Sequence, residues 1–104
     1  MTWRLGLLVS LTVGCRGPWV PVATEADAAR TNIAVAELNH GRALLVSHCS
    51  NCHQTPSPRD LAVADWPAEV DDMSERSGLD PDEVTAIKRY LIAFATAPIA
   101  TSAR

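Results

Sequence analysis

Apolar residues recur at helical spacing in the first half of the chain. Between residues 32 and 49, positions three or four apart are apolar or small, which places them on one helical face. Thr31 or Asn32 can act as N-cap, so the pattern predicts a helix from there to about Ser47. A glycine within a helix costs about 1 kcal/mol relative to alanine, so Gly41 indicates close approach of another element. The residues of this face are Ala34, Leu38, Gly41, Leu45 and Cys49.

A second helix has clear boundaries near the C-terminus. Asp80 can cap it, Pro81 suits the first helical position and Glu83 completes a capping box. Pro98 is expected to stop the helix. Its apolar stripe consists of Val84, Ile87, Leu91 and Phe94.

A third, shorter helix is expected from about Trp66 or Pro67 to Ser74, with Asp65 available as its cap. No alternating apolar and polar pattern predicts a strand. A chain of 104 residues has room for one small domain. The expected fold class is therefore all-α, with three to four helices.

The N-terminal residues are typical of an export signal. Arg4 supplies a positive charge, Leu5 to Val13 form an apolar run, and Gly14 precedes Cys15. The run is shorter than the roughly 20 apolar residues that span a bilayer. It resembles a bacterial lipoprotein signal, although Thr12 stands where that family prefers leucine. The resemblance implies export to the periplasm and lipidation of Cys15, with an ordinary secretory signal as the alternative.

These features divide the chain into four parts. We expect a signal peptide over 1–14, a flexible tether over 15–31, a folded domain over 32–97 and a disordered tail over 98–104. The formal charge of −3 argues against binding nucleic acid. Nine of the twelve acidic residues lie between Asp60 and Glu83, which suits either solubility or steering toward a basic partner.

The chemistry-bearing motif is Cys49-Ser50-Asn51-Cys52-His53. This is the attachment signature of c-type haem, in which two cysteines three residues apart form thioethers with the vinyl groups. The adjacent His53 is then placed to bind the iron as proximal ligand. We therefore expect one covalent haem c.

The two cysteines of the motif admit two other interpretations. Cys49 and Cys52 would suit a disulfide or a thioredoxin-like pair, but no βαβ pattern surrounds them. A zinc site would need a further ligand from His40, His48 or Cys15, and the chain has no second paired knuckle.

Over residues 38 to 95 the chain resembles the small class I cytochrome c family. In that family the first and last helices cross, and Gly41 and Tyr90 match the glycine and aromatic residue at the crossing. The resemblance implies that Met73 is the distal iron ligand. The spacing from His53 to Met73 is short and the family's Gly-rich loop is absent, which implies a minimal cytochrome c fold. The matching residues are Gly41 to Leu45, Cys49 to His53, Trp66, Pro67, Val70, Met73, Ile87, Tyr90 and Leu91.

The expected function is electron transfer by an exported single-haem cytochrome, not enzymatic catalysis. The alternatives are a haem subunit of a larger oxidoreductase and a ligand-sensing haem module. Expected partners are redox proteins with a basic surface, and the membrane through Cys15. Pro56 or Pro58 would accept a hydrogen bond from His53. Trp66 and Arg59 are candidates to reach the haem propionates.

Overall fold

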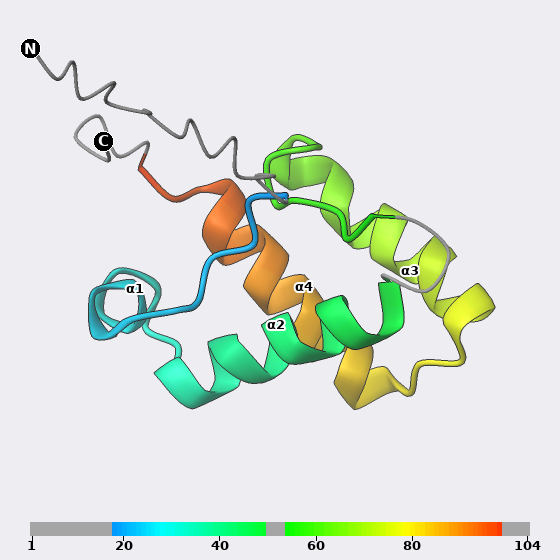
Figure 1. Ribbon diagram of the computed structural model, residues 1–104, viewed down its shortest axis with the longest axis horizontal. Coiled ribbons are helices and arrows are strands. Elements are labelled where there is room, and N and C mark those ends of the chain that lie inside the picture. Colours follow the sequence, from blue (N-terminus) through cyan, green and yellow to red (C-terminus); the bar gives the residue numbers. More distant parts are fainter. Residues whose placement is uncertain (1–17, 50–53, 99–104) are drawn as a thin grey trace, which may run out of the picture.

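The computed structural model describes residues 18–49 and 54–98. These residues form four α-helices and one short 3-10 helix, η1, and they contain no strand (Figure 1). The all-α prediction is therefore confirmed. The elements are α1 (Glu25–Thr31), α2 (Val35–Cys49), η1 (Val63–Asp65), α3 (Trp66–Ser77) and α4 (Pro81–Ala95).

Local hydrogen bonds define the start of α4 as the sequence predicts. The Asp80 carboxylate accepts a hydrogen bond from the Glu83 N–H at 2.9 Å, and Glu83 accepts one from the Asp80 N–H at 3.2 Å. Pro81 follows the cap, where its missing N–H removes no helical hydrogen bond. The capping box is therefore confirmed.

The cap leads to a prediction about acid stability. The hydrogen bond from the Glu83 N–H lowers the pKa of Asp80 below its usual value. A carboxyl group whose pKa is lowered by folding stabilises the native state above its unfolded pKa of about 3.9, and this contribution is lost as pH falls through the folded pKa. We expect Asp80→Ala to lower the melting temperature by a few degrees at pH 7, with the difference from wild type vanishing in strong acid.

Thermal melts at several pH values check this prediction. Asp82→Ala is the matched control, because it removes a carboxylate from the same turn and leaves the Asp80–Glu83 hydrogen bonds in place. An equal loss in both variants would mean that helix-end charge, not the cap, is responsible.

The predicted start of the first long helix is wrong by a few residues. Asn32 does not cap α2. It terminates α1 in the left-handed conformation, with φ of 57°, which asparagine tolerates better than most residues. Helix α2 begins at Val35 and continues to Cys49. Helix α3 also ends later than Ser74, because Gly78 provides a left-handed C-cap after Ser77.

The expected flexible tether over 15–31 is incorrect for its described part. Residues 25–31 form α1, and Arg30 on this helix donates a hydrogen bond of 2.7 Å to the Ala93 carbonyl of α4. Ala23, just before the helix, is buried. The sequence of this stretch has no apolar periodicity, but the stretch is held in place by contacts with distant residues.

Side chains from α2, α4 and the loop before η1 hold the extended residues 19–23, which we call the N-terminal strap. Asn39 both donates to and accepts from the backbone of Ala23. Burying such a backbone requires a partner for each polar group, and polar side chains supply them here. The other contacts are Arg42 to the Val20 carbonyl at 2.9 Å, Tyr90 to the Pro21 carbonyl at 2.6 Å and Ser57 to the Trp19 carbonyl at 2.8 Å.

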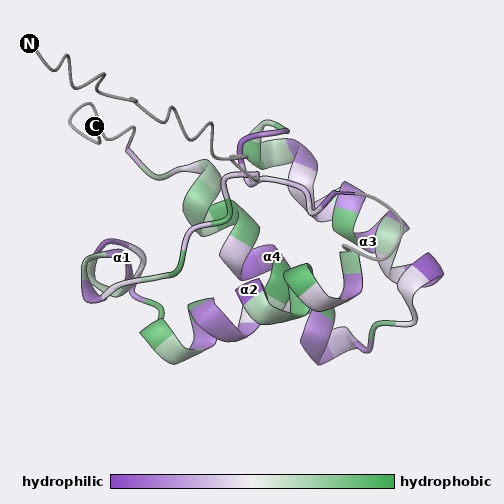
Figure 2. Ribbon diagram, viewed as in Figure 1, coloured by the Kyte–Doolittle hydropathy of each residue, from purple (hydrophilic) through white to green (hydrophobic). Residues whose placement is uncertain are grey.

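Helix α4 forms the centre of the fold and packs against both α2 and α3 (Figure 1). Figure 2 shows hydrophobic residues along much of α4 and at its crossing with α2. Gly41 lies at this crossing. A Cβ added there would lie 3.0 Å from the Tyr90 Cβ and closer still to the Ala86 carbonyl. The close approach predicted from Gly41 is therefore confirmed. The fully buried core side chains include Leu38, Leu45, Trp66, Val70, Ile87, Tyr90 and Leu91.

Candidate functional site

Two of the predicted site residues line one cavity of about 410 Å³. Cys49 is the last residue of α2, and Met73 lies in the middle of α3. The other predicted site residues, Cys15, Cys52 and His53, lie outside the described residues. The described residues that line it are His48, Cys49, Gln54, Pro56, Glu69, Asp72, Met73, Arg76 and Ser77.

The helical period of α3 brings Met73 to the cavity. Val70 is buried in the core, and a residue three positions later lies on a neighbouring part of the same face. Met73 is accordingly half-buried against the core and also lines the cavity. Its thioether thus belongs to the same cavity as the Cys49 thiol.

Burial raises the pKa of the Cys49 thiol above its usual value. A thiol of this kind stays protonated at neutral pH, whereas redox-active cysteine pairs depend on a stabilised thiolate.

The two candidate prolines have different surroundings. Pro58 is buried, and its carbonyl accepts a hydrogen bond of 2.8 Å from the indole N–H of Trp66. Pro56 lines the cavity instead. The structure thus separates two residues that the sequence leaves equivalent, and it places Pro56 in the same cavity as Cys49 and Met73.

Neither predicted propionate partner lines the cavity. Trp66 is a core residue with only 1% of its surface exposed. The Arg59 guanidinium stacks 4.0 Å from the centre of the Trp19 ring. Among the arginine and lysine residues that the structure describes, Arg76 lines the cavity, and it pairs with Asp72 at 3.6 Å. The sequence contains a signal for the position of Arg76. Glu69, Met73 and Arg76 are four and three residues apart, a spacing that places their side chains along one face of α3.

His48 connects the cavity to the start of α4. Its Nε2 lies 3.5 Å from a carboxylate oxygen of Glu83. His40 is exposed on α2. In the stretches 18–49 and 54–98, no three His, Cys, Asp or Glu side chains form a group suited to holding a metal ion. The same stretches contain no helix long and apolar enough to cross a membrane.

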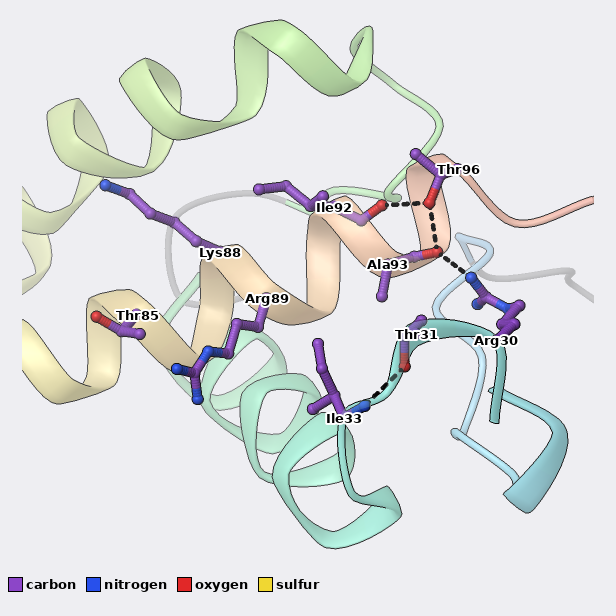
Figure 3. A pocket seen from close by; sticks show the side chains of 9 residues that line it. All are labelled: Arg30, Thr31, Ile33, Thr85, Lys88, Arg89, Ile92, Ala93 and Thr96. Carbon is purple, nitrogen blue, oxygen red and sulfur yellow. Dashed lines mark hydrogen bonds between the residues drawn. The ribbon is translucent and has the colours of Figure 1, made fainter. Parts of the chain in front are cut away.

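A second cavity, of about 390 Å³, lies along α4 beside the connection between α1 and α2 (Figure 3). Three cationic side chains line it, and each is paired with a carboxylate. Its charges are therefore balanced locally, and it contains neither Cys49 nor Met73. The pairs are Arg30–Asp27 at 3.0 Å, Lys88–Asp71 at 2.7 Å and Arg89–Glu37 at 3.3 Å.

Comparisons of this chain with protein-family models, with curated proteins and with solved structures found no match.

Proposed function

We propose that this protein is a small exported c-type cytochrome that transfers single electrons. Cys49 and Cys52 would hold one haem through thioether bonds, His53 would be the proximal iron ligand and Met73 the distal ligand. The observation that carries the proposal is the cavity lined by both Cys49 and Met73, because Cys49 is the first residue of the Cys49-to-His53 motif.

The residues of the cavity fit a haem. Cys49 and Met73 present half-buried sulfur atoms, and thioether sulfur is a soft ligand that haem iron accepts. Pro56 and Arg76 also line the cavity, where the Pro56 carbonyl would be available to the ring N–H of His53 and the Arg76 guanidinium to a propionate. A bound haem would accept and release one electron as its iron changes between the ferric and ferrous states.

The crossing of α2 and α4 supports the same proposal. The cytochrome c family places a glycine of its first helix against an aromatic residue of its last helix. Gly41 and Tyr90 meet in this way here. Helix α2 continues from this crossing to Cys49, which lines the cavity.

Charge around the cavity suggests the kind of redox partner. Glu69 and Asp72 line it, Arg76 offsets the charge of Asp72, and Glu83 lies beside the lining residue His48. The excess of carboxylates over this one arginine would attract a partner with a basic surface and raise the rate of encounter. This applies equally to a free electron carrier and to a subunit of a larger oxidoreductase. Export and lipidation of Cys15 remain predictions from the sequence.

Substitution of Met73 tests the proposed site. If its sulfur binds the iron, the oxidised protein has the weak near-infrared charge-transfer band of sulfur-ligated ferric haem. Met73→Leu removes the sulfur and keeps nearly the same volume, so packing changes little. We expect the band to disappear and the reduction potential to fall, because a ligand that favours ferrous iron is lost.

Near-infrared absorption and voltammetry of wild type and Met73→Leu provide the measurement. Met73→Ala should have the same spectral effect and also lower the melting temperature, because it leaves a cavity beside Val70. If wild type lacks the band, or if Met73→Leu retains the band and the potential, Met73 only packs and the electron-carrier proposal loses its distal ligand.

A further inference from the structure

The segment that follows the haem-attachment motif forms one wall of the cavity lined by Cys49 and Met73. Pro56 in this segment lines the cavity, whereas the next two residues, Ser57 and Pro58, are buried. Helix α3, to which Met73 belongs, forms another wall. Figure 1 shows the segment running beside α3. The space around Met73 therefore depends on how the segment is held against α3.

A buried hydrogen bond joins these two walls. The indole N–H of Trp66, the first residue of α3, donates to the Pro58 carbonyl at 2.8 Å. Both residues are less than 2% exposed, so water does not supply another donor in this arrangement. The N–H of Trp66, a candidate for a haem propionate from the sequence, is thus used inside the core.

Trp66 also shares a helical face with Met73. Trp66, Val70 and Met73 are four and three residues apart, and all three pack in or against the core. Seven residues of helix span roughly 10 Å, so Trp66 lies about two turns before the methionine. Trp66 therefore connects the helix that carries Met73 with the segment that carries Pro56.

A closed turn links the position of Pro58 to that of Pro56. The Ser57 N–H donates to the Asp60 carboxylate at 2.8 Å, and the Asp60 N–H donates to the Ser57 carbonyl at 3.0 Å. Two hydrogen bonds between the same two residues restrict the backbone of the turn. Because Ser57 stands between the two prolines, displacement of the Pro58 carbonyl also displaces the cavity wall at Pro56.

We propose that Trp66 is a positioning residue for Met73, and that its indole N–H holds the segment with Pro56 where the Met73 sulfur can bind the iron. The inference rests on the proposed function, in which Met73 is a ligand. It adds that a buried hydrogen bond outside the cavity controls this ligand. Without the N–H, the buried Pro58 carbonyl lacks a partner, and the turn moves toward water to regain one. The sulfur is then held less firmly on the iron.

Binding of imidazole to the oxidised, haem-loaded full chain tests the inference. Imidazole must displace the Met73 sulfur, so its affinity reports how firmly the sulfur is held. Trp66→Phe removes the N–H and keeps a buried aromatic ring. We expect this variant to retain haem covalently, to bind imidazole several-fold more tightly than wild type and to have a weaker near-infrared band.

Leu38→Val is the matched control, because it removes buried apolar volume from α2 near the end distant from Cys49. It should lower the melting temperature and leave the imidazole affinity unchanged. Asp60→Ala is a second test, because it opens the turn and should also tighten imidazole binding. Asp60 is exposed, so this variant should fold even if Trp66→Phe does not.

Three results would overturn the inference and leave the proposed function intact. The first is an unchanged imidazole affinity in Trp66→Phe. The second is an equal gain in Leu38→Val at a comparable loss of melting temperature, because general loosening would then be sufficient. If Trp66→Phe does not fold, the third is an unchanged affinity in Asp60→Ala. A wild type without the near-infrared band would instead overturn ligation by Met73, and this inference with it.

Discussion

Replacing both Cys49 and Cys52 with alanine is expected to abolish covalent haem retention. Each thioether of c-type haem uses one cysteine sulfur. A chain in which the two cysteines are both replaced therefore has no covalent bond to the macrocycle. Any haem held only through iron ligands is lost on denaturation. Haem staining of a denaturing gel should therefore give no band for the double variant and a weakened or absent band for each single variant.

Cys15→Ser is the matched control for this experiment. It also removes a cysteine, but one far from the motif, so staining should match wild type even if the membrane association changes. Unchanged staining of the Cys49→Ala, Cys52→Ala double variant would rule out the cytochrome interpretation.

Gly41→Ala is expected to destabilise the protein, in the opposite direction to the usual effect of this substitution. Within an exposed helix, alanine is favoured over glycine by about 1 kcal/mol. Here the new Cβ would collide with the Ala86 carbonyl and approach the Tyr90 Cβ to 3.0 Å. The carbonyl belongs to the backbone of α4 and cannot turn aside, so the helices must separate. Overpacking of this kind typically costs about 1–3 kcal/mol.

Chemical denaturation of wild type and Gly41→Ala measures this effect. Ala43→Val is the matched control, because Ala43 is exposed on the same helix and added methyl groups meet no neighbouring helix there. Apart from the lower helix propensity of valine, Ala43→Val should change the free energy of unfolding by no more than about 0.5 kcal/mol. A Gly41→Ala variant as stable as wild type would show that the α2–α4 crossing has room for a side chain.

The features predictable from sequence were those determined by neighbouring residues. The cap of α4 depends on residues 80–83 alone, and its side-chain hydrogen bonds form as expected. The close approach at Gly41 was predictable for a different reason, because a glycine inside a helix is costly without a packing purpose.

The N-terminal strap was missed because its partners are distant in the sequence. Tyr90 donates to the Pro21 carbonyl across 69 positions, and Asn39 bonds Ala23 across 16. Hydrogen bonds from side chains to an extended backbone leave no periodic signal. A stretch of alanine, threonine and acidic residues therefore has the composition of a linker although it packs against the domain.

The surroundings of the candidate site were predictable only in part. Cys49 was named by the motif, and Met73 by the resemblance to the cytochrome c family, which implies a methionine ligand downstream of the histidine. The tertiary structure was needed to show that Pro58 is engaged by Trp66 and that Arg59 stacks on Trp19. Arg76 was overlooked because α3 was expected to end before it, at Ser74.

The most direct test of the central claim is the haem content of the purified protein after extraction with acidified acetone. The protein should be expressed with export in cells that carry out c-type cytochrome maturation, and then purified and extracted. Its reduced spectrum in alkaline pyridine and its intact mass are then measured. We predict one haem per chain, retained with the protein and giving the spectrum of thioether-linked haem. A colourless chain whose mass shows no haem added to Cys49 and Cys52 would contradict the proposal. Haem that leaves with the acetone would contradict it as well.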